Sequence, residues 1–422
     1  MNDEYTSIHD VRMRGFTSRV RVEDAWRWID QVASRLEAEV VSLADLTGRV
    51  LAETVVARID VPPFARSAMD GYALHADETT GATSYAPATF RLVGDSMPGH
   101  PFDGVVISGT AVRIMTGAPL PRGADAVMPA EFAREVADTR TGTRLVEIQS
   151  DVPVGKNVGQ LGEDVRAGAE VLISGRRLRP QDVGLLAAVG CERIAVVRKP
   201  RVRMLTTGNE IVAPGATRRP FQIVDSNSMM LAGLITRDGG SIESSRLLPD
   251  HRDVLREQLA APGADVILVS GGSSVGAEDH APTLVADLGE LPIHGVAMRP
   301  SSPAGMGRVD GALVFLLPGN PVSCLCAYDF FAGRAIRRLG GRSPDWPYST
   351  RQVEVGRKIV SAVGRVDYTR VRLVEGRVEP IAISGASILT STTQADGFVI
   401  VPAELEGVAP GSTVTVHLYD FA

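Results

Sequence analysis

The 422-residue chain has few cysteines, no long apolar run and no excess of basic side chains. Its cysteines, Cys191, Cys324 and Cys326, form neither an even disulfide framework nor a paired zinc spacing, which favours a reducing compartment. No run of about eighteen apolar residues could span a bilayer. The first ten residues are acidic and polar rather than basic and then apolar, so no secretory signal is expected. The predicted location is therefore cytoplasmic.

The overall charge of the chain excludes one class of partner. A formal net charge of −6 argues against a general nucleic-acid-binding surface, so neither nucleic acid nor a membrane is an expected partner. The composition, 44% apolar and 22% charged, is that of a globular protein. The length exceeds that of one ordinary core and predicts two to four domains.

The composition and the apolar pattern of the sequence change along the chain and divide it into four parts. Residues 18–61 with 165–195 are predicted to form a discontinuous N-terminal linking domain, and residues 62–164, with short β-type runs between Gly, Pro and Asp, an inserted β-rich domain. Residues 196–342 alternate strand and helix signals, as an α/β layer domain does. Residues 343–422 are rich in Val, Thr, Ile and Gly and predict a small all-β unit. The predicted class is multidomain α+β.

The α/β segment has recognisable elements. Its apolar runs predict buried strands over 202–205, 266–269 and 313–317, and its helical spacing predicts helices over 228–235 and 251–259. Ser226 or Asn227 is the predicted N-cap of the first of these helices.

Two turns of this segment are suited to anions. Gly271, Gly272, Ser273 and Ser274 follow the strand over 266–269, and glycines there let backbone N–H groups approach an oxyanion. Pro318, Gly319, Asn320 and Pro321 follow the next strand and open a helix whose N-terminus can face an anion. Open α/β sheets bind ligands at such strand ends. Asp279 adds a carboxylate suited to Mg²⁺. The residues alone predict a site for a phosphate- or oxyanion-bearing ligand and a divalent metal.

Several motifs resemble those of a known family. SGGSSVGAED (270–279) and LPGNPVS (317–323) are similar to the signatures of the molybdopterin molybdenumtransferases, the MoeA or gephyrin E-domain family. The similarity continues through PPFARSAMDGYAL (62–74), RIMTGAPLPRGADAVMPAE (113–131), GQLGEDVRAG (159–168), TTGNEIV (206–212) and DSNS (225–228). It covers nearly the whole chain in the family's order, and the combination is specific.

The resemblance implies a fold and an assembly. It implies a central three-layer, MogA-like α/β domain, a β-rich inserted domain and a C-terminal small β-barrel. It also implies a homodimer whose active sites each form between the α/β domain of one chain and the inserted domain of the other. The partners it implies are adenylylated molybdopterin, molybdate, a molybdopterin adenylyltransferase and molybdoenzyme acceptors.

The resemblance assigns roles to polar residues that also have ordinary structural interpretations. Asp70 lies in an Asp-Gly turn, Thr116 in a Thr-Gly turn, and Asp164, Glu210 and Asp250 lie at turns or before helices, where such residues often act as caps. The resemblance places the first four in the active site. Asp250 is a candidate metal ligand, and capping is the equally weighted alternative for it.

Asp279 is the main metal candidate. Its ordinary interpretation is an exposed acid beside Glu278, but its position one short loop after Ser270 favours a site role. Several acids near a phosphate loop need cations to offset their repulsion, and Mg²⁺ bridging a phosphate would supply them.

One segment departs from the family pattern of lysines. Where the family has a lysine followed by Lys-Pro-Gly-Lys-Pro, this chain has Gly295, Arg299, Ser301 and Ser302 in place of the three lysines and the intervening glycine. Arg370 matches a family arginine, and the family's serine falls on Ala386, beside Ser387. Arginine and lysine are not interchangeable at an oxyanion site.

The implied activity is Mg²⁺-dependent insertion of molybdate into adenylylated molybdopterin with release of AMP. The catalytic candidates are Asp70, Thr116, Asp164, Glu210, Asp279, Arg299 and Arg370. The candidates for binding the substrate are the glycine turn over 271–274 and the Pro-Gly-Asn-Pro turn over 318–321. Two alternatives stay open. One is a paralogue that binds pterin nucleotide or a partner enzyme without inserting metal, and the other is an interaction scaffold.

Overall fold

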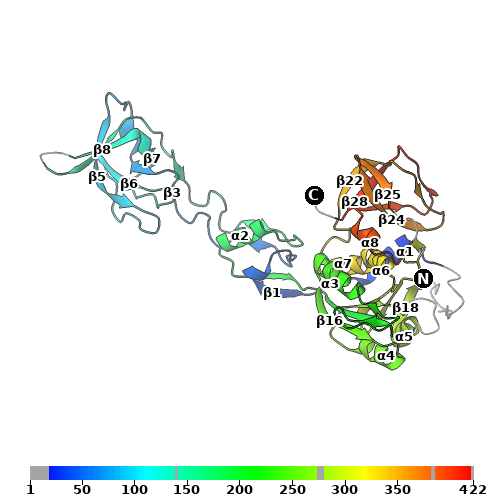
Figure 1. Cartoon of the computed structure of the whole chain (residues 1–422). Coiled ribbons are helices and arrows are strands. Elements are labelled where there is room, and N and C mark those ends of the chain that lie inside the picture. Colours follow the sequence, from blue (N-terminus) through cyan, green and yellow to red (C-terminus); the bar gives the residue numbers. More distant parts are fainter. Residues whose placement is uncertain (1–18, 138–140, 273–279, 382–384, 420–422) are drawn as a thin grey trace. The chain divides into compact units, whose positions relative to one another are not determined.

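The computed structural model describes residues 19–137, 141–272, 280–381 and 385–419. The chain divides into two compact units (Figure 1). Unit 1 takes the described residues up to 39, residues 48–50 and the described residues from 196 onward; unit 2 takes residues 40–47 and 51–195. The chain passes from one unit to the other within or beside β1 (Ala38–Ser42), η1 (Leu43–Asp45) and β12 (Arg193–Val197).

Unit 2 is built on a six-stranded sheet with the strand order β7-β4-β6-β5-β9-β8. Strands β5 and β6 run parallel, and the other neighbours in the sheet run antiparallel. The strands are β4 (Gly71–Leu74), β5 (Ala88–Ser96), β6 (Thr110–Ile114), β7 (Ala126–Pro129), β8 (Ala133–Ala137) and β9 (Arg144–Ile148). The β-rich character predicted for this part of the chain is confirmed.

Both faces of this sheet are covered. Along β4, Tyr72 and Leu74 join a core with Phe90 and Met128, whereas the intervening Ala73 joins a second, smaller core. This alternation follows from the opposite directions of successive side chains in a strand. The remaining elements of unit 2 are β2 (Val55–Val56), β3 (Arg66–Ser67), η2 (Ala76–Thr79), η3 (Ala130–Phe132), β10 (Val158–Gly159), β11 (Glu170–Leu172) and α2 (Pro180–Ala188).

Unit 1 contains a second six-stranded sheet with the order β16-β13-β17-β21-β20-β18. The first four strands run parallel, and β20 and β18 complete the sheet in antiparallel fashion. The strands are β13 (Arg201–Thr207), β16 (Ser241–Leu248), β17 (Val266–Ser270), β18 (Gly289–His294), β20 (Gly305–Val309) and β21 (Ala312–Leu317). All five residues of β17 and all six of β21 are buried, as expected for central parallel strands.

Helices cover both faces of this sheet (Figure 1). One core joins alternate strand residues such as Met204 and Leu268 to α1, α3, α6 and α7, and a second joins Leu205 and Ile267 to α4 and α5. The helices are α1 (Val22–Val32), α3 (Asn227–Asp238), α4 (Arg252–Ala260), α5 (Ala281–Leu288), α6 (Pro321–Ala327), a π-helical turn η4 (Tyr328–Ala332) and α7 (Gly333–Leu339). The predicted three-layer α/β domain and the multidomain α+β class are confirmed.

The N-terminal helix α1 packs within unit 1. Its Trp26 indole N–H donates to the carbonyl of Phe330 at 2.8 Å, and Arg334 of α7 forms a two-pronged ion pair with Asp30 at 2.9 and 2.7 Å. The α1 residues Ala25 and Ile29 are fully buried. Sequence spacing gives the apolar face of this helix but not its partner.

A third sheet, of C-terminal strands, receives one strand from the α/β region. Its order is β19-β24-β26-β28-β22, and β25 pairs with β24. Strand β19 (Met298–Arg299) runs parallel to β24 and sets Arg299 opposite Asp367. The remaining elements of unit 1 are β14 (Ile211–Val212), β15 (Ile223–Val224), β22 (Ser349–Glu354), β23 (Ile359–Val360), β24 (Val366–Val374), β25 (Arg377–Pro380), α8 (Thr390–Thr393), β26 (Gly397–Val401), β27 (Gly407–Val408) and β28 (Thr413–Leu418).

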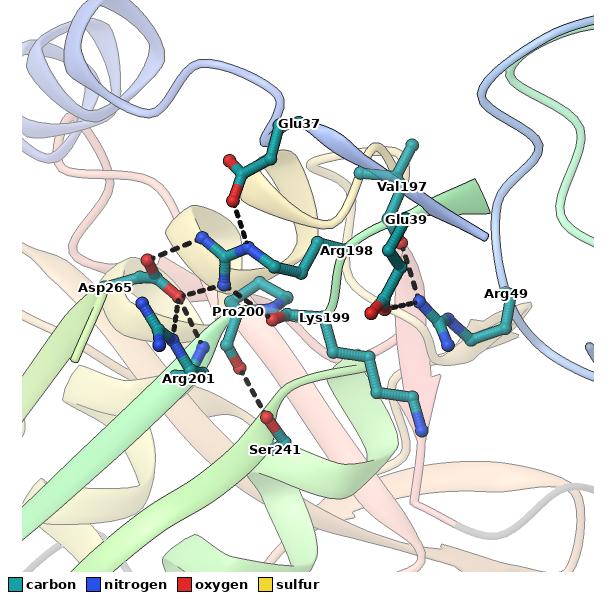
Figure 2. Close-up of polar contacts among 10 residues, drawn as sticks. All are labelled: Glu37, Glu39, Arg49, Val197, Arg198, Lys199, Pro200, Arg201, Ser241 and Asp265. Atoms are coloured by element: carbon teal, nitrogen blue, oxygen red, sulfur yellow. Dashed lines mark hydrogen bonds and ion pairs between the residues drawn. The ribbon is translucent and has the colours of Figure 1, made fainter. Parts of the chain in front are cut away.

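A cluster of charges fixes the chain where it enters β13 (Figure 2). Arg198 donates to both carboxylate oxygens of Asp265, at 2.7 and 2.9 Å, and to Glu37 at 2.5 Å. The backbone N–H of Arg201 donates to the same carboxylate at 2.7 Å. Asp265 lies one residue before β17, so the cluster aligns the starts of two adjacent strands of the sheet.

In the part of the chain that the structure describes, none of the helices combines the length and the apolar character needed to cross a membrane.

Candidate active site

A cavity of about 1080 Å³ lies at the carboxyl ends of the parallel strands of unit 1. The register aligns Thr206 of β13 with Ser270 of β17, and Ser270 with Leu317 of β21, so the loops that follow these strands share one edge of the sheet. These loops line the cavity, as the sequence predicted for the ligand site. The lining includes Gly271, Gly272, Pro318, Gly319, Asn320 and Pro321 from the two predicted anion turns.

The glycine turn needs its glycine for space and for conformation. Gly271 has a φ of +91°, and a Cβ there would lie 2.5 Å from the carbonyl oxygen of Thr207. Its Cα lies 3.6 Å from the position of a Cβ on Gly319, so the two loops approach closely. An L side chain at position 271 would meet both backbone strain and a steric clash.

Asn227 ties the two loops together. Its side-chain amide donates to the hydroxyl of Ser270 at 2.9 Å and to the carbonyl of Gly319 at 2.8 Å. Asn227 is the first residue of α3 and lines the cavity. The sequence predicted only a capping role for Asn227. Its side-chain hydrogen bonds to Ser270 and Gly319 show that it also joins two loops of the cavity.

One of the two residues predicted to cap α3 lies at its N-cap position. Ser226 occupies the N-cap position without a side-chain capping hydrogen bond. The backbone N–H of Ser228 donates instead to Asp225 at 3.0 Å, and the Ser228 hydroxyl donates to the same buried carboxylate. Asp225 therefore accepts the capping hydrogen bonds at the start of the helix, and the Asn227 side chain is left to join the two loops.

Two acidic residues lie on the cavity wall beside β13. Asp250 accepts the backbone N–H of Asn209 at 3.1 Å, and its own N–H donates to the Asn209 side chain at 3.2 Å. Glu210 is exposed, and its backbone carbonyl accepts the N–H of Ile223 at 2.9 Å. Both residues line the cavity. Within the described ranges, no group of three or more His, Cys, Asp or Glu side chains could hold a metal ion.

The opposite wall comes from residues 298–303 and from the C-terminal strands. Arg299 forms an ion pair with the buried carboxylate of Asp367, which also accepts the hydroxyl of Ser361 at 2.6 Å and lies 4.0 Å from Arg365. Arg370 donates to the Ser391 hydroxyl at 2.5 Å. The cavity thus brings Arg299 and Arg370 together with Glu210 and Asp250, and Asp367 is a partner that sequence reasoning did not identify.

The turn after Arg299 keeps a backbone suited to glycine. Ser301 stands at the position where the resembled motif has glycine, and its φ is +85°. A serine in this conformation is strained, but its buried hydroxyl donates to the carbonyl of Ser323. The hydrogen bond of the serine hydroxyl therefore holds the turn in a conformation that favours glycine.

The remaining described candidates belong to unit 2. The backbone N–H and the hydroxyl of Thr116 both donate to one oxygen of Asp70, each at 2.7 Å. These two hydrogen bonds lower the pKa of Asp70. The structure thus brings Asp70 and Thr116 together after strands β3 and β6, and Asp164 is exposed in a loop where its N–H donates to Val61 at 3.0 Å.

Three predicted site residues, Ser273, Ser274 and Asp279, lie outside the described residues.

The cysteines beside the cavity are packing groups. Cys324 and Cys326 are fully buried on α6, and burial raises the pKa of the Cys324 thiol to about 12. A thiol with so high a pKa is a poor nucleophile at neutral pH.

Comparisons with known proteins cover nearly the whole chain. Residues 20–190 match the MoeA N-terminal region (domain I and II), residues 203–338 a probable molybdopterin binding domain, and residues 352–419 the MoeA C-terminal region (domain IV).

Individual relatives show the same extent. The chain is 33% identical over 410 residues to molybdopterin molybdenumtransferase 2 of Mycobacterium tuberculosis, covering 94% of this chain and 98% of the relative. It is 30% identical over 405 residues to the molybdopterin molybdenumtransferase of Haemophilus influenzae, covering 93% and 97%. A crystal structure of the molybdopterin biosynthesis MoeA protein of Pyrococcus horikoshii superposes with a TM-score of 0.81 at 31% identity, covering 96% of this chain and all of that one.

Proposed function

Because the chain belongs to the MoeA family of molybdopterin molybdenumtransferases, enzymes of molybdenum cofactor biosynthesis, we propose that it converts adenylylated molybdopterin and molybdate into molybdenum cofactor and AMP. Water cleaves the phosphoanhydride, so that AMP and the phosphate of molybdopterin separate. The dithiolene sulfurs then bind molybdenum, and each oxygen they displace takes up protons and leaves as water. The observation that carries the proposal is the cavity shared by the glycine turn, the Pro-Gly-Asn-Pro turn and Arg299.

The two turns are suited to hold the nucleotide and pterin part of the substrate. Gly271 and Gly319 let the two turns approach each other closely, and Asn227 joins the turns through two hydrogen bonds. Backbone N–H groups held in this way stabilise phosphate oxygens without reorganising. Pro321 at the start of α6 fixes the second turn.

The acidic wall is suited to Mg²⁺. This ion usually binds through one or two carboxylates together with substrate phosphates and water, and Asp250 and Glu210 offer such carboxylates on one wall of the cavity. We propose that they hold it together with Asp279. The chemistry that a bound Mg²⁺ supplies there is neutralisation of phosphate charge and polarisation of the phosphoryl group.

Further assignments rest on the resemblance. We propose that Asp70, Thr116 and Asp164 belong to the active site, and that the protein acts as a homodimer in the cytoplasm. We also propose that the domain boundaries of the protein are those of the four segments predicted from the sequence. Light scattering on the purified chain tests the dimer, since a monomer at micromolar concentration would contradict it.

A second candidate function is supported by the altered lysine segment. Gly295 and Ser302 carry no charge where the family has lysine, and Arg299 is engaged by Asp367. A paralogue that binds pterin nucleotide without inserting metal would tolerate these changes. Against it, the chain has only three lysines, Lys156, Lys199 and Lys358, among 44 Lys and Arg residues. Replacement of lysine by arginine at position 299 therefore follows the composition of the whole protein.

Release of AMP distinguishes the two functions. Purified chain is incubated with adenylylated molybdopterin and Mg²⁺, with and without molybdate, and AMP is quantified by chromatography. We expect molybdate-dependent AMP release with many turnovers. Tight substrate binding without AMP release would favour the non-inserting paralogue.

A further inference from the structure

The described chain begins at a segment that is fixed against the altered lysine motif. The backbone N–H of Val20 donates to the carbonyl of Gly295 at 3.0 Å, and the N–H of Ala297 donates to the carbonyl of Val20 at 2.8 Å. Val20 and Val296 are parallel bridge partners. These two hydrogen bonds fix the main chain next to Arg19.

The side chain of Arg19 reaches a residue of the cavity wall. Its Nε–H donates to the hydroxyl oxygen of Ser302 at 2.7 Å, and Ser302 lines the cavity. Since the hydroxyl oxygen accepts this bond, its own proton is available to donate elsewhere. A hydroxyl that accepts from a cation is polarised and becomes a stronger donor to an anion.

The described wall of the cavity carries both acidic and basic side chains. Arg299 and Arg365 both face the buried carboxylate of Asp367. Glu210 and Asp250 add negative charge to the lining. Arg370 also lines the cavity. A doubly charged oxyanion would therefore meet acidic as well as basic side chains, and a hydroxyl oriented to donate to it would favour binding.

We propose that Arg19 is a positioning residue for the oxyanion substrate. Its guanidinium orients the hydroxyl of Ser302 as a donor to the oxyanion, at the position where the resembled motif has lysine. The proposal rests on the proposed function and identifies how this chain compensates the altered motif. The ligand class is a tetrahedral dianion, with molybdate and tungstate as the probes.

The structure also indicates which position can restore a lysine. Gly295 has a φ of +92°, a conformation that favours glycine, so lysine there would be strained. Ser302 is not among the residues with positive φ and is half-buried beside the cavity. Ser302→Lys is therefore the restoring substitution.

The test measures the Kd of the full chain for molybdate and for adenylylated molybdopterin by calorimetry. We expect Arg19→Gln and Ser302→Ala each to weaken molybdate binding about tenfold, the effect of losing one charge-assisted contact, with the Kd for the pterin nucleotide changed less than about twofold. Arg19→Lys keeps the charge and should fall between wild type and Arg19→Gln. Adding Ser302→Lys to Arg19→Gln should restore molybdate binding.

Arg21→Gln is the matched control. Arg21 is an exposed neighbour that lies 3.4 Å from Glu23 and 4.0 Å from Glu404, so its loss removes the same charge from the same segment. Equal weakening by Arg21→Gln and Arg19→Gln would overturn the proposal, as would unchanged molybdate binding in Arg19→Gln. The difference between Arg19→Gln and wild type should also shrink at high salt, because the contact is exposed.

The outcomes separate this inference from the proposed function. If wild type binds molybdate through Arg19 but releases no AMP, the inference stands and the proposed function fails. If wild type releases AMP and Arg19→Gln does so with an unchanged KM for molybdate, the inference fails and the function stands.

Discussion

At Gly271 the cavity wall has no room for a side chain. We predict that Gly271→Ala lowers the free energy of unfolding by about 1–3 kcal/mol, the range for strained backbone positions, because the φ of +91° and the 2.5 Å approach to the Thr207 carbonyl both oppose a Cβ. It should also weaken pterin-nucleotide binding, since the loop must move. Denaturant unfolding and calorimetry measure the two effects.

Gly233 provides the control for this prediction. It lies within α3, and a Cβ there meets no atom within 4 Å. Gly233→Ala should stabilise the protein by about 0.5–1 kcal/mol, because alanine is the better helix former, and leave binding unchanged. If Gly271→Ala behaved like Gly233→Ala, the assigned φ of Gly271 and its close approach to the Thr207 carbonyl would be contradicted.

The start of α3 tests the identity of its cap. Asp225→Ala removes the acceptor of the Ser228 N–H and should cost about 0.5–2 kcal/mol of unfolding free energy, as N-cap losses do. Ser226→Ala removes no capping bond and should change stability by less than about 0.5 kcal/mol. Thermal unfolding of the two variants decides between them, and a larger loss in Ser226→Ala would support the cap predicted from sequence.

At the scale of single residues, local sequence patterns predict the two turns but not the partners of the polar side chains. The two turns could be placed because Gly and Pro carry their own backbone preferences. The partners Asp225, Asp367 and Arg19 could not, because their contacts depend on which distant segments meet. Ser302 and Arg19 are separated by 283 positions, and no local pattern connects them.

At the scale of elements, the Arg198 cluster joins the starts of β13 and β17 (Figure 2). Burial alone would raise the pKa of Asp265, but hydrogen bonds from Arg198 and from the Arg201 N–H outweigh it and lower this pKa. A carboxylate with a lowered folded-state pKa contributes stability above its ordinary pKa of about 3.9, and the contribution is lost as the pH falls through the folded-state value.

We therefore predict that Asp265→Asn costs about 1–3 kcal/mol at pH 7, because it leaves Arg198 without its two-pronged partner. The difference from wild type should shrink as the pH is lowered below about 4, where the wild-type carboxylate gains its proton. Urea unfolding at a series of pH values measures this dependence.

An exposed ion pair is the matched control for Asp265. Asp287 lies 2.7 Å from Arg252, but its side chain is 42% exposed, whereas that of Asp265 is 14% exposed. Asp287→Asn should cost at most about 1 kcal/mol at any pH. A difference between Asp265→Asn and wild type that stays constant from neutral to acidic pH would contradict the assigned role of the cluster.

The elements themselves divide into those with a local signal and those without one. Strands β17 and β21 follow from unbroken apolar runs, and α4 from its spacing of Leu255 and Leu259. Strand β19 has only two residues and exists because it pairs with β24. Its pairing sets Arg299 against Asp367, so the element that sequence could not predict determines how that arginine is engaged.

At the scale of the whole molecule, composition and motif order were the reliable guides. The motifs run through both units, and the family assignment rests on similarity over nearly the whole chain. The scarcity of lysine is a property of the entire sequence, so arginine at position 299 does not by itself indicate lost activity. The activity depends on whether residues 295–302 still bind the oxyanion substrate.

Transfer of molybdenum to the pterin tests this account most directly. Purified chain is given adenylylated molybdopterin, Mg²⁺ and molybdate, and molybdenum that co-elutes with the released pterin is quantified by elemental mass spectrometry. We predict one molybdenum per pterin, formed together with AMP, and a slower reaction in Arg19→Gln that Ser302→Lys restores. Pterin free of molybdenum after full incubation of the wild-type chain would contradict the account.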